Sequence, residues 1–522
     1  MKGTYHTVGL YFSICLLLFI AIQNIMAEDD KMPLEQIVRL SSTKGTVYKF
    51  IKEISDQSGY LFVYDSRIID NDQKIKIKKG DYPLTEAIYT ITGNDNIRID
   101  ILDKYILLRL PEETGLASSE KETLELKVQD HFVIRGNMLD QIDGKPIVYG
   151  SIQVVGTSLG TVSNHDGGFQ LVLPDSLRAN KIQLSHIGYE SLEIEPVLLE
   201  GQDINFFLEP KAVSLEEVVI KPVDPVKVMN YILEKRKENY FSQPVLLTSF
   251  YREGITYKNQ NIDITEAVLQ VFKSSYYYDF NQDQARLIKK RRIVDSQKSD
   301  TILPKLKAGI NTCFVLDIMK ELPDFIDLSN NDNLYTYKHE TINFIDDRKI
   351  NVISFEQKKG ITEPLYKGTL FVESENGALR EAHFELNPQF VHKATNLFLD
   401  KKGPKLAITL EQAKYIVSYK QSAFGQYYIS HIRGDVIFKV RRKKRLFSNP
   451  LHFWFEMVSC KMDTDGVKNF SKKERVPSTK IFAETKHIYD KDFWGDFNII
   501  LPEEQLKETI INNLNEVILN IE

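Results

Sequence analysis

The sequence predicts a multidomain, β-rich protein: a small α/β domain, then a β-sandwich, then a large antiparallel β domain with flanking helices. The chain has 522 residues, which allows about three or four domains of ordinary size. Hydrophobic residues make up 42% of the chain, enough for each domain to bury a core. Alternation of apolar and polar residues, which is typical of strands, covers far more of the chain than helical spacing does.

The charge of the chain is nearly balanced. Lys and Arg number 67 and Asp and Glu number 72, so the formal net charge is −5. A general nucleic-acid binder depends on a basic field over much of its surface, and this composition excludes one. We therefore expect no nucleic acid among the partners.

The first residues predict a secretory signal peptide over residues 1–27. Lys2 precedes an almost unbroken apolar run at residues 8–22, and cleavage is expected between Ala27 and Glu28. The alternative is an uncleaved anchor, because this run is close to the shortest that spans a bilayer. We expect an exported protein in the periplasm or associated with the outer membrane.

Two cysteines, Cys313 and Cys460, remain once the leader with its Cys15 is removed. Both have apolar neighbours, which favours two separate buried thiols. Their spacing leaves open whether they form a disulfide. A small scaffold held together by several disulfides is excluded.

Residues 34–110 predict a small α/β domain with the order β-α-β-β-α-β-β. Two helices are indicated by apolar stripes at i, i+3, i+4 and i+7. The first stripe is followed by Ser58 and Gly59 as a stop signal, and the second lies between Pro83 and Gly93. The stripes are Val47, Phe50, Ile51 and Ile54, then Leu84, Ala87, Ile88 and Ile91.

This order, together with three short phrases, resembles the secretin and TonB short N-terminal domain. The phrases are Gly45-Thr46-Val47, Ser58-Gly59-Tyr60 and Tyr82-Pro83-Leu84-Thr85-Glu86-Ala87. The resemblance implies a periplasmic protein–protein contact module, of the kind found on outer-membrane secretins and on signal-transducing TonB-dependent receptors. It implies no catalysis.

A polar linker at residues 111–130 precedes a predicted β-sandwich at residues 131–210, where short strands alternate with turn residues. This part resembles the carboxypeptidase regulatory-like domain, a transthyretin-type sandwich. That module is the accessory domain of certain carboxypeptidases and not the zinc-bearing one. The matching phrases are Arg135-Gly136, Gly144-Lys145-Pro146-Ile147, Gly156-Thr157-Ser158-Leu159-Gly160-Thr161, Asp166-Gly167-Gly168-Phe169 and Ile187-Gly188-Tyr189.

Several motifs imitate active sites without the context that chemistry requires. Ser158 lies in a formal G-x-S-x-G, but strands are predicted on both sides, whereas a nucleophile elbow needs a strand and a helix. None of the ten histidines begins an H-x-x-E or H-E-x-x-H motif. We therefore expect no catalytic residues, no metal site and no cofactor.

A second linker is predicted at residues 211–223. Its sequence resembles the Leu-Glu-Glu-Val-Val-Val segment that follows the same sandwich in nutrient-uptake TonB-dependent receptors. The alternative is a last strand plus linker with no coupling role. The candidate TonB-box-like contact residues are Leu215, Glu216, Glu217, Val218, Val219 and Ile220.

Residues 224–522 predict the large β domain. It opens with a helix that has Asp224 as its cap, Pro225 in its first turn and one apolar face. Apolar–polar alternation then predicts strands at 262–264, 267–272, 367–373, 382–386, 407–410, 415–419, 427–432, 436–440 and 452–457. The apolar face of the helix is Val226, Met229, Ile232 and Leu233.

The end of the chain favours a curved, water-soluble sheet crossed by a helix over a membrane-embedded one. Apolar residues return there at helical spacing, and no closing aromatic strand follows. The tail at 493–503 and the residues around Tyr251 resemble those of secreted carboxypeptidase-like regulatory domain-containing proteins, a resemblance that implies no activity. The residues at helical spacing are Leu506, Ile510, Leu514, Val517 and Ile518.

Two basic runs, at residues 289–292 and 441–445, are the remaining candidates for a contact surface. Such runs bind anionic lipid or polysaccharide in some proteins. The second run lies between two predicted strands, so a solvated hairpin tip is the alternative.

Taken together, these features predict a non-catalytic cell-envelope interaction protein that acts beside TonB-dependent outer-membrane uptake or signalling. Its expected partners are envelope proteins, such as a TonB-dependent receptor or a TonB-system component. The alternative is a carrier of a lipid or other apolar ligand in an open C-terminal β half-barrel, and a minor alternative is an envelope hydrolase. The sequence does not predict the oligomeric state.

Overall fold

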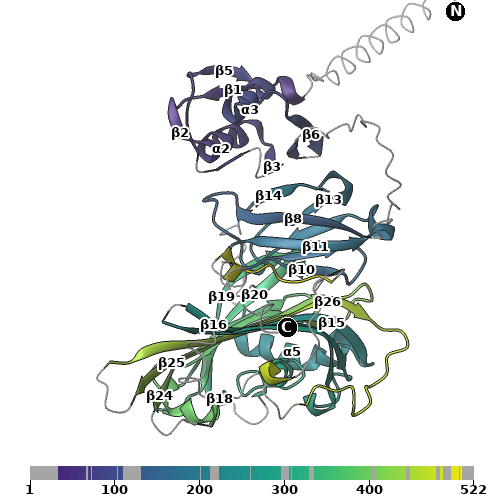
Figure 1. Cartoon of the computed structure of the whole chain (residues 1–522), viewed down its shortest axis with the longest axis vertical. Coiled ribbons are helices and arrows are strands. Elements are labelled where there is room, and N and C mark those ends of the chain that lie inside the picture. Colours follow the sequence, from purple (N-terminus) through teal and green to yellow (C-terminus); the bar gives the residue numbers. More distant parts are fainter. Residues whose placement is uncertain are drawn as a thin grey trace, which may run out of the picture. The chain divides into compact units, whose positions relative to one another are not determined.

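The computed structural model divides into two compact units, Met1–Glu120 and Lys121–Glu522, which are described separately (Figure 1). The fold class is confirmed: strands predominate, and the second unit contains a ten-stranded antiparallel sheet. The structure describes residues 33–65, 69–71, 73–102, 104–109, 131–199, 201–211, 223–258, 260–294, 305–306, 309–328, 334–401, 406–442, 447–477, 482–485, 495, 497–504 and 506–507.

The first unit contains both predicted helices, and all eight residues of the two predicted stripes are buried. The Thr46 side chain caps α2 by accepting a hydrogen bond from Lys49 N, and Gly59 ends it at φ 75°. The elements are β1 (Ile37–Leu40), β2 (Lys44–Thr46), α2 (Val47–Ser58), β3 (Leu61–Asp65), β4 (Lys74–Lys76), β5 (Gly80–Pro83), α3 (Leu84–Thr92), β6 (Arg98–Leu102) and β7 (Tyr105–Arg109).

The strands of this unit belong to several separate sheets and do not form the one small sheet that the sequence predicts. β3 pairs in parallel with β7, and β7 pairs with β6. Two additional short strands, β5 and β2, pair with β1 and β4. The first expected strand begins instead as a 3-10 turn at Pro33–Glu35. The resemblance to the secretin and TonB short N-terminal domain stays a prediction.

The sandwich in the second unit consists of one sheet in the order β10-β9-β12-β13 and a second in the order β11-β8-β14. Residues such as Ile134, Ile152, Phe169 and Phe206 fill the space between them and are fully buried. The strands are β8 (His131–Asp140), β9 (Ser151–Val154), β10 (Gly160–Val162), β11 (Gly168–Pro174), β12 (Ile182–Ser185), β13 (Leu192–Ile194) and β14 (Asp203–Leu208).

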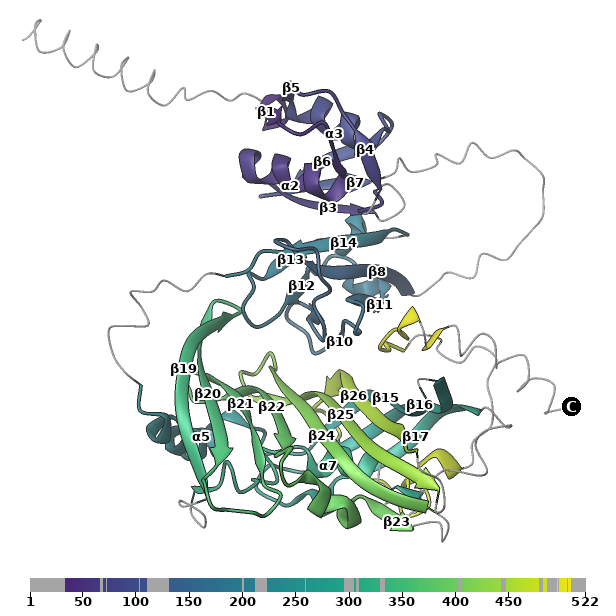
Figure 2. The same cartoon turned by 90° about the vertical axis from the view of Figure 1, so that its left-hand side faces the viewer.

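The large sheet has the order β17-β16-β15-β26-β25-β24-β22-β21-β20-β19, and Figure 2 shows its curvature. Alternation along each strand gives it one apolar and one polar face. Its strands are β15 (Val245–Tyr257), β16 (Gln260–Lys273), β17 (Gln284–Val294), β19 (Tyr335–Ile345), β20 (Arg348–Gln357), β21 (Tyr366–Glu373), β22 (Leu379–Leu386), β24 (Leu406–Gln421), β25 (Tyr427–Arg442) and β26 (Asn449–Asp463), with a separate pair β18 (Lys305–Leu306) and β23 (Leu399–Lys401).

The apolar face of this sheet carries the main core. Helices α5 (Pro225–Asn239) and α7 (Ile310–Val315), the 3-10 helix η5 (Val391–Leu397) and residues 316–326 pack against it. Asp224 caps α5 by accepting a hydrogen bond from Val226 N, as predicted. The predicted apolar face of α5 is wrong at Val226, which is 46% exposed, because the helix turns Val228 into the core instead.

The sandwich is attached to the polar face of the large sheet by residues 497–501. The Asn498 side chain hydrogen-bonds both N and O of Val172, at 2.6 and 3.1 Å. Thr161 Oγ1 donates to Ile499 O at 2.9 Å. On the other side, Arg252 Nη2 donates to Ile500 O at 2.7 Å. A small apolar cluster of Val162, Phe250, Val458, Cys460, Ile499 and Ile500 is buried at the same attachment.

Within the described residues, no helix is both long enough and apolar enough to cross a bilayer. Cys313 and Cys460 are both buried free thiols, which confirms the interpretation that they are separate. Several predictions lie outside the described residues: the apolar run at 8–22, the cleavage position at Ala27 and Glu28, and most of the C-terminal helical pattern. Leu506 is described, and it packs against Ile264, Ile293 and Trp454.

Candidate binding groove

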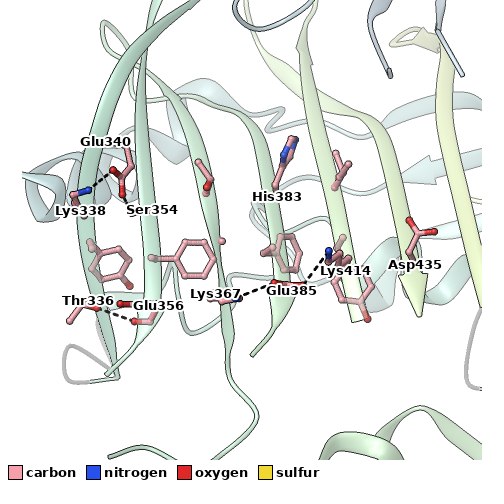
Figure 3. Close-up of a pocket in the computed structure, with 17 residues that line it drawn as sticks. Thr336, Lys338, Glu340, Ser354, Glu356, Lys367, His383, Glu385, Lys414 and Asp435 are labelled. Carbon is pink, nitrogen blue, oxygen red and sulfur yellow. Dashed lines mark hydrogen bonds and ion pairs between the residues drawn. The ribbon is translucent and has the colours of Figure 1, made fainter. Parts of the chain in front are cut away.

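An open groove of about 810 Å³ runs across β19, β20, β21, β22, β24 and β25 (Figure 3). Strand pairing aligns its lining residues in two rows, polar except for Ile416, which we call row one and row two. Row one is Lys338, Ser354, Thr369, His383 and Ile416. Row two is Thr336 and Glu356, then Lys367, Glu385, Lys414 and Asp435.

The residues between the two rows point to the opposite face of the sheet, because successive side chains in a strand alternate. Phe355 and Phe384 belong to this intermediate set, and both rings pack on Phe325 in the core, with ring centroids 4.4 and 5.2 Å away. Tyr415 packs on Phe384 in the same layer. The backbone of the strands therefore forms the floor of the groove, and polar side chains form its walls.

Ion pairs between Lys and Glu side chains connect the residues of row two. The carboxylate of Glu385 lies 3.3 Å from Lys367 Nζ and 3.6 Å from Lys414 Nζ. Near row one, Lys338 Nζ lies 2.5 Å from Glu340, and the hydrogen bonds from Lys338 and Ser354 lower the pKa of that carboxyl. Exposed pairs contribute little to stability, so charged groups of a ligand can replace them at low cost.

His383 in row one is fixed by Glu381, which lies two residues away on β22 and outside the groove lining. Nε2 of His383 lies 2.5 Å from Glu381 Oε1, and Ser418 Oγ donates to the other oxygen at 2.9 Å. Burial would raise the pKa of Glu381, but the hydrogen bond and charge of His383, with smaller effects of His186 and Ser418, lower it to about 2. Burial would lower the pKa of His383, but Glu381 raises it. Each group therefore favours the charged form of the other.

The site residues predicted from the sequence and the residues of the groove lie in different parts of the chain. Ala27, Glu28 and the six residues from Leu215 to Ile220 lie outside the described residues, so their contact roles stay predictions. Within the described part, no cluster of three or more His, Cys, Asp or Glu is placed to hold a metal ion. Ser158 of the formal G-x-S-x-G lies between β9 and β10 and hydrogen-bonds Met462, so it has strands on both sides as predicted.

The basic run at 289–292 lies on β17, where side chains of the run bind other parts of the chain. Lys290 Nζ donates to the carbonyls of Phe482 and Ala483 at 2.9 and 2.7 Å. Arg292 pairs with Asp263 at 2.6 Å. In the second run, Arg442 ends β25, and residues 443–446 lie outside the described residues.

Sequence reasoning missed β19 and β20, which form one wall of the groove. The signal that could have found them is the turn between them, Asp346-Asp347, whose residues have φ of 48° and 61°. Two consecutive left-handed residues of the Asn/Asp type mark a tight hairpin turn.

Comparison with known proteins gives one match by sequence family. The CarboxypepD_reg-like domain matches residues 134–220, which confirms the regulatory-like sandwich predicted from the sequence. The match extends over residues 212–220, which contain the candidate contact segment. No curated protein matches the chain by sequence.

Comparison with solved structures gives only distant likenesses. A domain described as an outer membrane lipoprotein-sorting protein from Vibrio parahaemolyticus is 11% identical, covering 47% of this chain and 95% of that one, with a TM-score of 0.20. A DUF1329 family protein from Desulfovibrio piger is 13% identical, covering 47% and 96%, with a TM-score of 0.21. Lipovitellin is 8% identical, covering 44% and 26%, with a TM-score of 0.21. Scores this low say nothing about function.

Proposed function

We propose that this protein is a non-catalytic envelope protein whose large β domain binds an extended, charged segment of a partner protein. The observation that carries the proposal is the groove over β19–β25, with its two rows of mainly polar side chains. The apolar face of the same sheet is already covered by α5, α7 and η5. Recognition on this sheet therefore takes place on its polar face.

A polypeptide suits this groove better than a lipid does. Pockets for apolar ligands are lined mainly by hydrophobic and aromatic side chains. Here the rings of Phe355 and Phe384 point into the core, and Lys367, Glu385 and Lys414 provide charges of both signs. Alternating charges match a partner segment that carries both acidic and basic residues, and they select its register.

The location and class of partner are supported by the sequence. The leader pattern at residues 1–27 supports export to the periplasm or the outer membrane. The resemblance of residues 34–110 to the secretin and TonB short N-terminal domain supports a partner in TonB-dependent uptake or signalling. The segment from Leu215 to Ile220 is a second candidate contact with the same system.

Charge reversal in row two tests this function. The double variant Lys367→Glu/Lys414→Glu places three carboxylates side by side, and Lys461→Glu on β26, outside the groove, is the matched control. The full chain is purified from native envelope extracts and the recovered proteins are quantified. We expect a partner recovered with the wild type and with Lys461→Glu, and at least tenfold less with the double variant. Equal recovery with all three forms would contradict the proposal. Lipid that co-purifies and is lost in the double variant would favour the apolar-ligand carrier instead.

A further inference from the structure

A second cavity lies between the sandwich and the polar face of the large sheet. It has a volume of about 270 Å³ and is separate from the groove. From the sandwich, Ser151, Gln153, Gln183 and Ser185 contribute hydroxyl and amide groups to its wall. From the large sheet, β22, β24 and β25 contribute charged and imidazole side chains. The volume suits a small molecule, since about 150 Å³ is enough to hold a benzene ring.

Most of the charges around this cavity are already paired. Arg380 lies 2.6 Å from Glu373 and 3.1 Å from Asp346. Arg348 lies 3.1 Å from Glu373 and donates to Gln421 at 2.7 Å. Glu381 is taken by His383 and Ser418. The Arg groups and their carboxylates thus balance one another.

Lys420 is the exception. It is 8% exposed and lines the cavity, and its side chain has no hydrogen bond or ion pair with any residue that the structure describes. Burial is the largest influence on this amine and lowers its pKa to about 8. The nearby carboxylate of Asp346 acts on this amine only at a distance and pairs with Arg380. A buried ammonium without a direct partner is costly, so the cavity favours an occupant that brings negative charge.

His431 is the second group without a partner. It is 1% exposed, it lines the same cavity, and neither ring nitrogen has a hydrogen-bond partner in the described part of the chain. Its ring packs on Tyr149, with ring centroids 4.7 Å apart. Tyr149 has a left-handed backbone, φ 58°, which is rare for an aromatic residue and is found at sites where function requires it.

We propose that this cavity binds a small anion with carboxylate or phosphate oxygens, held by the Lys420 ammonium and a ring N–H of His431. The hydroxyl and amide groups of Ser151 and Gln183 can donate to the same oxygens from the sandwich side. Because both layers contribute, a bound anion would also link the sandwich to the large sheet. The site is distinct from the groove and does not depend on it.

Lys420→Met tests the site, because it removes the charge and keeps the length of the side chain. Lys461→Met is the control, since Lys461 is exposed and pairs with Asp463 at 2.8 Å on β26. Each full-length protein is titrated calorimetrically with phosphate, acetate and succinate at constant ionic strength, and its thermal midpoint is recorded. We expect the wild type and Lys461→Met to bind at least one of these anions, and Lys420→Met to bind it at least tenfold more weakly. Comparing phosphate with acetate and succinate shows whether the site prefers phosphate or carboxylate oxygens.

The stability of the unliganded variant provides an independent readout. Without added anion, Lys420→Met should melt at the same temperature as the wild type or higher, because an unpaired buried charge has been removed. A lower midpoint would mean that Lys420 has a structural partner, and it would overturn the proposal. Unchanged anion affinity in Lys420→Met, or no binding of any of the three anions to the wild type, would overturn it as well.

Discussion

Ser158 of the sandwich and Met462 of the large sheet are joined by two hydrogen bonds. Ser158 Oγ donates to Met462 O at 2.8 Å and accepts from Met462 N at 3.0 Å. The two residues are 304 positions apart in the chain. The regulatory-like sandwich is therefore bonded directly to the domain that contains the groove.

Replacing this hydroxyl should loosen the attachment. Ser158→Ala removes both hydrogen bonds, and we expect a loss of about 1–2 kcal/mol in the free energy of unfolding. The amide of Met462 should also exchange its hydrogen faster, which mass spectrometry measures. Ser471→Ala is the control, because that hydroxyl bonds only the exposed Glu474. Unchanged protection at Met462 would show that this contact does not hold the two layers together.

Arg252 is the centre of a buried ion network beneath the same attachment. It is 1% exposed, and it lies 2.7 Å from Glu266 and 2.9 Å from Glu456. Arg252→Met leaves two buried carboxylates short of a partner, so we expect a loss of about 3–5 kcal/mol in a denaturant melt. Arg178→Met removes an exposed pair with Asp175 and should cost less than about 1 kcal/mol. Similar losses in the two variants would contradict the network.

The stability of the protein should depend on pH because the buried carboxyl of Glu253 has a raised pKa. Burial is the main influence and raises its pKa to about 7, although the hydrogen bond from Tyr251 opposes the change. The folded state then binds more protons than the unfolded state between the ordinary pKa of 4.5 and about 7. The contribution is therefore favourable at low pH and is lost as the pH rises through 7.

Glu253→Gln should remove this dependence, because an amide does not titrate. Relative to the wild type, we expect it to gain up to about 3 kcal/mol between pH 5 and pH 8. Urea melts at the two pH values measure the difference. A wild-type-to-variant difference that stays constant from pH 5 to pH 8 would show that Glu253 is already ionised.

Row-two variants should leave the fold intact. The side chains of Lys367 and Lys414 are 39% and 53% exposed, and among the described residues their ion-pair partner is Glu385. Replacing both by Gln removes these pairs without placing like charges opposite one another, so it should change the free energy of unfolding by less than about 1 kcal/mol, as measured by chemical denaturation. A large loss would mean that row two stabilises the sheet instead of serving a ligand.

The sequence could predict elements that depend on neighbouring residues. The stripes of α2 and α3 follow from helical spacing, and their ends follow from Thr46, Gly59 and Gly93. The fragments predicted at 407–410 and 415–419 belong to one strand, β24. They looked separate in the sequence because a bulge between Leu410 and Gln412 interrupts the alternation. The sandwich that matches the CarboxypepD_reg-like domain was predictable because its turn residues have a characteristic order.

The groove and the anion cavity could not be predicted in the same way. In β19 the polar residue His339 pairs with the core residue Ile353, and a bulge follows it, so the alternation of this strand is weak. Lys414 and Glu385 meet only because β22 pairs with β24. Lys420 and His431 are unremarkable in the sequence, and only the placement of the sandwich over them makes them unpaired and buried.

The most direct measurement is photocrosslinking from inside the groove. A benzophenone amino acid at Thr369, in the middle of row one, is compared with one at Lys468, an exposed position outside the groove lining. Our account predicts that the Thr369 position crosslinks in native envelopes to one defined peptide of a partner protein, that Lys367→Glu/Lys414→Glu abolishes this crosslink, and that Lys468 gives none. A Thr369 crosslink to lipid, or a peptide crosslink that survives the charge reversal, would contradict it.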